Sequence, residues 1–266
     1  MSLEQAKATL RRLGWTDRVR PMVMGAFFAD LLAPSRRTIV QTDDGLSYFV
    51  DPLSQFGRTL VNDGRYELET EQMIRERLAE GDSFLDVGAN EGYFSVLAAS
   101  VVGQAGYVAA VEPQSRLCEI IRINLGLNGA NGNVFHGALG GAKGESIELF
   151  HSPALNTGYS SVLKRPRFTR SSETVMFLDL ADMLGGRDAF ALVKVDVEGF
   201  EDGVVRSLLP LLQQGKVKAL LLDYHAPILA ARGVDPVAIE RSVLDAGMKL
   251  VGEYEGFGNY RLYVRG

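Results

Sequence analysis

The residues best suited to chemistry are two carboxylates that stand one residue apart. Asp196 and Glu198 follow a largely apolar run that ends at Val195, and His225 follows a second one that ends at Asp223. In an extended chain, residues two positions apart point to the same side, so the two carboxylates are expected to face together. A positioned carboxylate or imidazole can take the proton of a reacting hydroxyl group. We therefore expect Asp196, Glu198 and His225 to be catalytic residues that handle a proton.

Two other interpretations of these residues stay open. Asp196 and Glu198, together with Asp223, could supply oxygen ligands to a divalent cation at adjoining strand ends. Alternatively, the carboxylates could brace the strand ends, and His225 could have a structural role. Proton transfer is the interpretation that we favour, and it needs no metal ligand.

Several nearby residues are expected to have structural roles. Glu201 opens the next helix and is expected to interact with the N-terminal dipole of that helix. Lys194 is expected to point away from the carboxylate pair and to pack behind the strand. His136 and His151 are weaker candidates for a base, and Cys118 is expected to lie in the core among the apolar residues of its helix.

A glycine turn between a strand and a helix predicts a nucleotide site. In segment 84–94, FLDVGANEGYF, Gly88 and Gly92 allow a tight turn and a close approach of a ligand to the backbone. The helix that follows begins with unpaired N–H groups at the strand ends, where ligands of such sheets bind. Glu112, at the end of the next strand, could accept hydrogen bonds from both ribose hydroxyls of an adenosine.

This turn fits three interpretations: a tight turn without a ligand, a dinucleotide site, or a site for S-adenosylmethionine (SAM). The dinucleotide fingerprint Gly-x-Gly-x-x-Gly has glycine where this chain has Asn90, and the larger residue would obstruct a pyrophosphate. SAM has no phosphate, and Asp86 before the turn suits its ammonium group better than it would suit a phosphate. We therefore expect SAM to be the cofactor.

Strand and helix patterns alternate from residue 81 to residue 266. This alternation predicts an α/β fold with a Rossmann-like, mostly parallel sheet covered by helices on both faces. Residues 255–258 between the last two strands are too few for a crossover helix, so the last strand is expected to be antiparallel. The expected strands are 83–87, 107–111, 133–138, 192–196, 219–223, 249–254 and 260–264, and the expected helices are 93–102, 114–127, 200–209 and 236–246.

Residues 1–80 have a different pattern and are expected to form an N-terminal extension to a domain of residues 81–266. The extension is expected to hold helices at 3–13 and 22–32, a β-hairpin at 38–50 around Asp43-Asp44-Gly45, and a linking helix at 69–78. Segment 151–168 is rich in Ser, Asn, Gly and Pro, which predicts a long loop, and such loops often cover active sites.

Three blocks of the sequence resemble the FkbM family of SAM-dependent methyltransferases. They are LDVGANEGYFS at 85–95, VEP at 111–113 and VKVDVEGFE at 193–201, of which the last is the most specific mark. The resemblance covers roughly residues 50–255. Shorter matches are GRYE at 64–67, Asn124 with Asn128, GYSS at 158–161 and LDL at 178–180.

The resemblance implies a seven-stranded class I methyltransferase fold and methyl transfer to a hydroxyl of a sugar, glycan or polyketide-like natural product. It implies that Asp86, Gly88 and Asn90 surround the methionine part of SAM. Glu112 would hold the ribose, and the GRYE match would bring Tyr66 and Glu67 to the cofactor or the acceptor. The expected cofactor-binding residues are Tyr66, Glu67, Asp86, Gly88, Ala89, Asn90, Tyr93, Phe94, Glu112, Pro113, Gly137, Ala138 and Asp196.

One departure from the family lies at Asp223-Tyr224-His225, where the family usually has Glu-x-His. The aspartate is shorter than the glutamate and reaches less far.

A nucleotide-dependent oxidoreductase and a non-catalytic SAM-binding module are the alternative functions that we keep.

Composition and charge narrow the class of protein. The chain is 46% apolar and 23% charged, which predicts a packed core. Its net charge of −5 gives no sign of a nucleic-acid partner. No apolar run is long enough to span a membrane, and a single cysteine cannot form an intrachain disulfide. We expect a cytoplasmic protein with a small-molecule or glycan acceptor, and leave a homodimer open.

Overall fold

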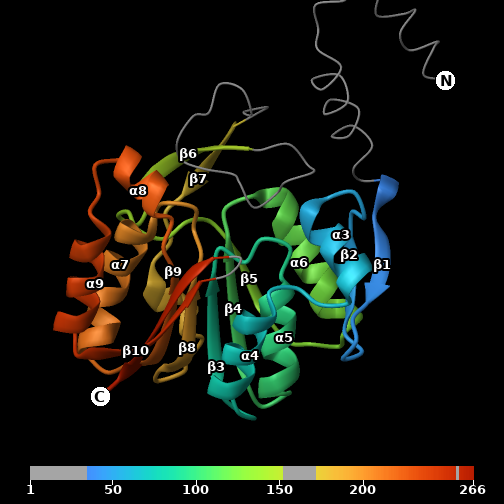
Figure 1. The fold of residues 1–266 in the computed structure, drawn as a ribbon, viewed down its shortest axis with the longest axis horizontal. Coiled ribbons are helices and arrows are strands. Elements are labelled where there is room, and N and C mark those ends of the chain that lie inside the picture. Colours follow the sequence, from blue (N-terminus) through green and yellow to red (C-terminus); the bar gives the residue numbers. More distant parts are fainter. Residues whose placement is uncertain (1–34, 152–171, 256–257) are drawn as a thin grey trace, which may run out of the picture.

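The computed structural model describes residues 35–151, 172–255 and 258–266. Its centre is a seven-stranded sheet with the order β10-β11-β9-β8-β3-β4-β5 (Figure 1). Strands β5, β4, β3, β8 and β9 are parallel, and β11 is antiparallel to both β9 and β10, which confirms the predicted fold class. The strands of this sheet are β3 (Ser83–Val87), β4 (Tyr107–Glu112), β5 (Asn133–His136), β8 (Phe190–Val195), β9 (Val217–Asp223), β10 (Met248–Glu255) and β11 (Asn259–Arg265).

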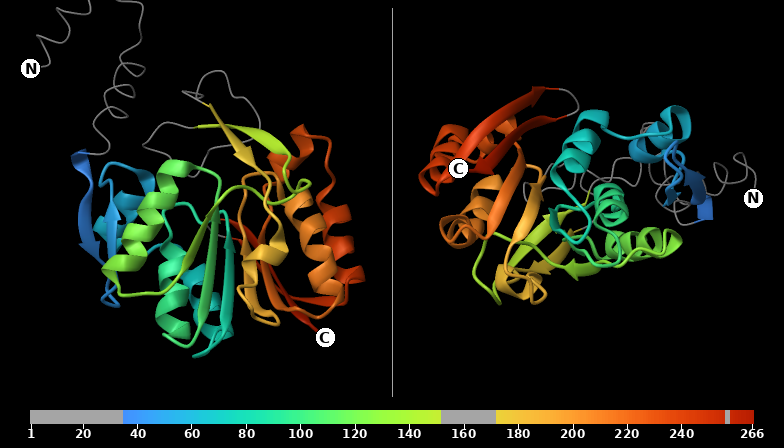
Figure 2. Two further views of the ribbon diagram at one scale, coloured as in Figure 1. Left: turned by 180° about the vertical axis from the view of Figure 1, so that it is seen from behind. Right: turned by 90° about the horizontal axis from the view of Figure 1, so that it is seen from below.

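Helices cover both faces of the sheet (Figures 1 and 2). Phe84 and Ala110 pack on one face with residues of α4, α5 and α6, whereas Leu85 and Val111 pack on the other face with α7 and α9. Since both faces are buried, the parallel strands are apolar on both sides. These helices are α4 (Leu68–Arg77), α5 (Tyr93–Val102), α6 (Ser115–Leu127), α7 (Glu201–Gln213) and α9 (Pro236–Asp245).

Helix α7 continues beyond its predicted end. The sequence predicts an end at Leu209, because Pro210 cannot donate a helical hydrogen bond. In the structure α7 runs through Pro210 to Gln213, and Leu212 is completely buried in the core that α7 shares with α9. Burial of this turn outweighs the lost hydrogen bond. The ends of the other predicted helices and strands of the sheet differ from the structure by no more than two residues.

A β-hairpin joins the described part of the N-terminal region to the sheet domain. Strands β1 (Thr38–Gln41) and β2 (Ser47–Val50) form the predicted hairpin, and α4 is the predicted linking helix. Asn124 of α6 accepts a hydrogen bond from Phe49 N (2.6 Å), and Asn128 accepts one from Ser47 N (2.9 Å). Two asparagines of the family resemblance therefore dock β2 onto α6. Helix α3 (Gln55–Asp63) was not predicted, and the predicted helices 3–13 and 22–32 lie outside the described residues.

A second antiparallel pair lies at the same end of the central sheet as α8 (Ala226–Ala231), as Figure 1 shows. It consists of β6 (Ser146–Phe150) and β7 (Ser172–Met176), which the sequence did not predict. A 3₁₀ helix, η2 (Leu180–Met183), follows it. The predicted loop 151–168 lies outside the described residues except for its first residue. Within the described ranges, no helix combines the length and the apolar character that a membrane span requires.

Candidate functional site

The glycine turn after β3 lies directly against the loop after β8. Gly88 has a φ of 84°, a conformation that favours glycine. A Cβ at this position would stand 1.8 Å from the backbone oxygen of Asp196. Glycine is therefore required for two reasons, and it brings the predicted cofactor turn into contact with the predicted catalytic loop. Ala89, the next residue, donates its N–H to the carbonyl of Val111 in β4 (3.1 Å).

Glu112 closes this turn from the end of β4. Its Oε2 accepts a hydrogen bond from Asn90 N (2.8 Å), and its Oε1 accepts one from Gln114 N (2.9 Å). The residue is 3% exposed, and burial raises the pKa of its carboxyl to about 7. Asn90 has a φ of 52°, and its Oδ1 is buried without a hydrogen-bond partner in the described part of the chain. The sequence predicted the position of Glu112 but not its hydrogen bonds to the turn.

Asp86 and Lys194 form a buried pair beneath the turn. Asp86 is completely buried, accepts a hydrogen bond from Ser95 Oγ (2.6 Å) and lies 3.8 Å from Lys194 Nζ. Burial raises the pKa of Asp86. Burial would lower the pKa of Lys194, but the charges of Asp196, Asp86 and a third carboxylate outweigh it and raise that pKa.

The prediction that Lys194 packs away from the carboxylate pair is wrong. Its Nζ donates to Asp196 Oδ2 at 3.2 Å, and it lies over the ring of Phe94 at 5.0 Å. The physical reason is the two-residue repeat of a strand, which puts positions 194 and 196 on the same side. Lys194 thereby holds Asp196 in place. Burial would raise the pKa of Asp196, but the positive charges of Lys194 and His225 outweigh it and lower that pKa.

The three predicted catalytic side chains converge at the ends of β8 and β9. His225 Nε2 lies 3.6 Å from Glu198 Oε2 and 3.9 Å from Asp196 Oδ1. Asp223 Oδ2 is 3.7 Å from the same nitrogen. The extended backbone that the sequence predicted does not reach Glu198, because β8 ends at Val195. Glu198 reaches the cluster through a left-handed backbone with a φ of 50°.

Glu201 holds the other side of the His225 ring, a role that the sequence did not predict. Its Oε1 lies 2.7 Å from His225 Nδ1 and accepts a hydrogen bond from Gly199 N (2.9 Å). Glu201 is completely buried. Burial alone would lower the pKa of His225, but the hydrogen bond to Glu201 and the neighbouring carboxylates raise it to about 9. The imidazole is thus fixed in orientation by a carboxylate at the start of α7.

Tyr260 is a residue of the candidate site that sequence analysis missed. Its hydroxyl lies 3.3 Å from Glu67 Oε2 and 3.4 Å from Asp196 Oδ2. The register of β11 against β9 pairs Tyr260 with Asp223, which carries it to the cluster. Burial, together with the charge of Asp196, raises the pKa of Glu67. The only signal in the sequence was the predicted antiparallel last strand, which did not fix its register.

Three predicted cofactor-binding aromatics lie in a core between α4 and α5. The Tyr93 ring stands 5.6 Å from the Tyr66 ring and 5.2 Å from the Phe94 ring. The Tyr93 hydroxyl donates to Glu71 Oε2 (3.1 Å) and accepts from Tyr66 N (3.3 Å). Tyr93 is 5% and Phe94 is 6% exposed. The described contacts of Tyr93 and Phe94 are structural, and their contact with a cofactor stays a prediction.

The remaining predicted residues lie at the end of β5 beside Glu112. Gly137 N donates to Glu112 O (3.2 Å), and a Cβ on Gly137 would stand 2.4 Å from Leu178. Ala138 N donates to Met176 O (3.0 Å). His136 Nε2 lies 3.1 Å from Pro113 O.

The two weaker histidine candidates lie apart from the catalytic cluster. His136 Nε2 lies 3.1 Å from Glu173 Oε1, and His151 Nε2 lies 3.3 Å from Glu173 Oε2. Burial lowers the pKa of His151. Cys118 is buried, as predicted, and is a free thiol.

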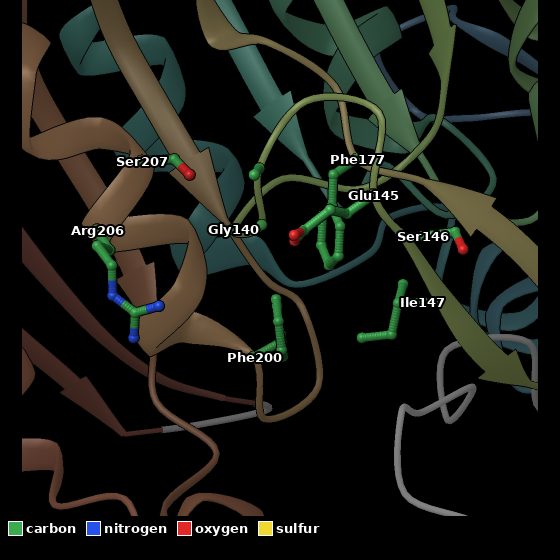
Figure 3. A pocket seen from close by; sticks show the side chains of 10 residues that line it. Gly140, Glu145, Ser146, Ile147, Phe177, Phe200, Arg206 and Ser207 are labelled. Carbon is green, nitrogen blue, oxygen red and sulfur yellow. The ribbon is translucent and has the colours of Figure 1, made fainter.

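A cavity of about 540 Å³ lies between α7, β6 and the residues that follow β5 (Figure 3). Arg206 and Ser207 stand on one side of it, and Phe177 and Phe200 stack within it with ring centres 6.1 Å apart. Its lining residues do not include Asp196, Glu198, His225 or Glu112. The cavity therefore does not coincide with the predicted site.

A search against protein-family models matches residues 86–250 to the methyltransferase FkbM domain. This match covers more than half of the chain. The chain belongs to the FkbM methyltransferase family. It is accordingly a methyltransferase, and the alternative of an oxidoreductase is not supported. A search of curated proteins finds no match.

Solved structures with a similar fold include methyltransferases of several kinds. This FkbM-family chain aligns with the Pyrococcus abyssi tRNA (uracil-54, C5)-methyltransferase in complex with S-adenosyl-L-homocysteine at 14% identity and a TM-score of 0.47. That alignment covers 86% of this chain and 44% of the other, so this chain spans less than half of that relative's length. Aeropyrum pernix fibrillarin with natively bound S-adenosyl-L-methionine aligns at 13% identity and a TM-score of 0.46, covering 88% and 86% of the two chains. The precorrin-6y C5,15-methyltransferase of Geobacter metallireducens aligns at 13% identity and a TM-score of 0.42, covering 74% and 87%.

Proposed function

We propose that this protein is a SAM-dependent O-methyltransferase that acts on a hydroxyl of a sugar, glycan or polyketide-like natural product. The observation that carries the proposal is the contact between Gly88 and the backbone of Asp196, where a Cβ would stand at only 1.8 Å. A cofactor at the glycine turn would therefore lie beside Asp196, Glu198 and His225. Groups that handle a proton suit a hydroxyl acceptor, because an alcohol must lose its proton when it is methylated.

The residues around the turn fit SAM. A carboxylate has about four lone-pair positions, and the two backbone N–H groups that bind Glu112 leave others for ribose hydroxyls. The buried Oδ1 of Asn90 could accept a further hydrogen bond at the turn. SAM, when bound, supplies a methyl group on a positively charged sulfur. Burial of Asp86 and of the turn would keep water away from the cofactor.

The carboxylates of the cluster would take the proton of the acceptor, and His225 would orient the acceptor. His225 is fixed through Glu201, and Asp196 is fixed through Lys194 and Tyr260. Positioned groups of this kind lower a barrier by reducing the freedom of the reacting pair. Tyr66 would complete the wall beside Asp196 together with Glu67, whose Oε2 lies 3.3 Å from the Tyr260 hydroxyl.

We also propose the division of the chain into an N-terminal extension, residues 1–80, and a methyltransferase domain, residues 81–266. The extension would contribute Tyr66 and Glu67 to the site. A cytoplasmic location and a small-molecule or glycan acceptor belong to the same proposal, with no nucleic-acid partner. The net charge of −5 supports the last point.

The test is transfer of a labelled methyl group from SAM to a panel of glycans and hydroxylated polyketides, with product identification by NMR. We expect the label on oxygen. Glu198→Gln and Asp196→Asn should lower the single-turnover rate by roughly 10²–10⁴-fold, whereas Asp182→Asn, at a surface carboxylate paired with Lys143, should not. Label on nitrogen or carbon, or full rates in both cluster variants, would refute the proposal.

A further inference from the structure

The loops after β8 and β9 bring three potential metal ligands to one point. His225 Nε2 lies 3.6 Å from Glu198 Oε2 and 3.9 Å from Asp196 Oδ1. Ligand atoms of the three residues all lie within 4.8 Å of one another. These separations are longer than hydrogen bonds. They suit atoms that share one ion, because ligands about 2.0–2.6 Å from a cation stand about 3–4.5 Å from one another.

The imidazole is held in the way that metal-binding histidines are held. His225 Nδ1 lies 2.7 Å from Glu201 Oε1, and Glu201 is completely buried. A histidine that binds a metal through one nitrogen commonly donates the other N–H to a carboxylate, which fixes the ring. In this structure that arrangement leaves Nε2 to face Asp196 and Glu198.

The charges around the point are predominantly negative. Asp196, Glu198, Glu201 and Asp223 bring four carboxylates to one imidazole, and Lys194 lies against only one of them, Asp196, at 3.2 Å. Like charges in a partly buried site repel one another unless a cation lies between them. The protonated imidazole offsets part of this repulsion, and a divalent ion that replaces the Nε2 proton would offset more of it.

The set of ligands differs from the one that the sequence suggested. Asp223 was the third oxygen ligand of that alternative. Its Oδ1 accepts a hydrogen bond from Asn259 N (2.8 Å). Its Oδ2 lies 3.7 Å from His225 Nε2, but Asp223 is not among the residues whose ligand atoms all lie within 4.8 Å of one another. His225 takes its place, because the chain turns after β9 and carries the imidazole between the two carboxylates. Asp223 then contributes charge at the edge of the site.

We propose that Asp196, Glu198 and His225 bind one divalent cation, with Glu201 as a positioning residue. A mixed set of carboxylate and imidazole ligands suits ions such as Mn²⁺. Three protein ligands leave positions open for water or for an acceptor oxygen. An acceptor hydroxyl bound there would have a lowered pKa; this role rests on the proposed function, whereas binding of the ion does not.

The test measures the binding of Mn²⁺ to the full chain. Binding is detected as a loss of the EPR signal of free Mn²⁺. We expect one ion per chain. Glu198→Gln and His225→Gln should weaken binding by at least roughly tenfold, and Glu201→Gln should weaken it by roughly 10–100-fold. Asp182→Asn and His136→Gln, which alter a carboxylate and a histidine outside the cluster, should bind Mn²⁺ as the wild type does. Circular dichroism would establish that each variant is folded.

Two results would overturn the proposal: no bound Mn²⁺ at millimolar concentrations in folded wild-type protein, or binding that the three cluster variants leave unchanged. SAM affinity, measured by calorimetry on the same samples in EDTA, separates this outcome from failure of the proposed function. Wild-type protein that binds SAM normally but does not bind Mn²⁺ would reject the cation site alone. Mn²⁺ binding without SAM binding would reject the proposed function and leave the cation site standing.

Discussion

Glu112 allows a quantitative test, because its carboxyl is buried and its pKa is raised from 4.5 to about 7. The folded state therefore keeps the proton that the unfolded state loses between these two values. Stability consequently falls as pH rises through that window, by about 3 kcal/mol in total at about 1.4 kcal/mol for each unit of difference in pKa. Glu112→Gln is neutral at every pH and should lack this fall.

The assay is urea unfolding of the wild type and of Glu112→Gln at pH 5 and pH 8. The glutamine turns an NH₂ group toward a backbone N–H. This should lower the free energy of unfolding by roughly 1–3 kcal/mol at both pH values. Relative to that of the wild type, the free energy of unfolding of the variant should rise by about 2–3 kcal/mol between pH 5 and pH 8. Glu119→Gln, at an exposed position of α6, is the matched control and should show no such gain. An equal pH dependence in wild type and Glu112→Gln would refute the reasoning.

The same carboxyl should control cofactor binding if it holds the ribose. With a pKa of about 7, the ionised fraction rises about tenfold between pH 6 and pH 8. SAM affinity, measured by calorimetry, should rise by a similar factor, because an ionised acceptor binds hydroxyl groups more strongly. In Glu112→Gln the affinity should be weaker and independent of pH over this range. A wild-type affinity that is flat from pH 6 to pH 8 would separate Glu112 from the ribose.

Two further predictions concern stability. Lys194→Met removes the ammonium between two carboxylates and should lower the free energy of unfolding by roughly 3–5 kcal/mol. Lys143→Met at the surface is the control and should leave the urea midpoint unchanged. An equal effect of the two substitutions would contradict the burial argument. Asn124→Ala should cost roughly 1–3 kcal/mol by leaving the N–H of β2 unpaired, and hydrogen exchange should show faster opening of the β1–β2 hairpin. Asn131→Ala, on an exposed loop, is its control, and unchanged exchange in Asn124→Ala would show that the hairpin is held by other contacts.

Much of the fold could be predicted because its signals are local. The sheet strands and helices α5, α6, α7 and α9 were predicted from apolar runs and glycine breaks. By contrast, β6 and β7 are short, and five of the ten β6–β7 residues are polar or charged: Ser146, Glu148, Ser172, Glu173 and Thr174. Their stability comes from pairing across a long connection, which leaves no local pattern. Helix α3 was missed for a related reason, since it is a short helix with few apolar residues, of which Phe56 and Leu60 are buried.

The candidate site divides in the same way. The sequence by itself determined that Gly88 and Glu112 stand at the ends of neighbouring strands and that Asp196 and His225 follow two others, because the order of strands and helices fixes which end of the sheet each loop occupies. Only the tertiary structure decided which of these side chains touch. The β11 register brings Tyr260 to Asp196, the left-handed backbone of Glu198 turns it toward His225, and buried Glu201 orients that ring. Such contacts depend on packing between elements far apart in the chain. A single sequence does not give the distances between those elements.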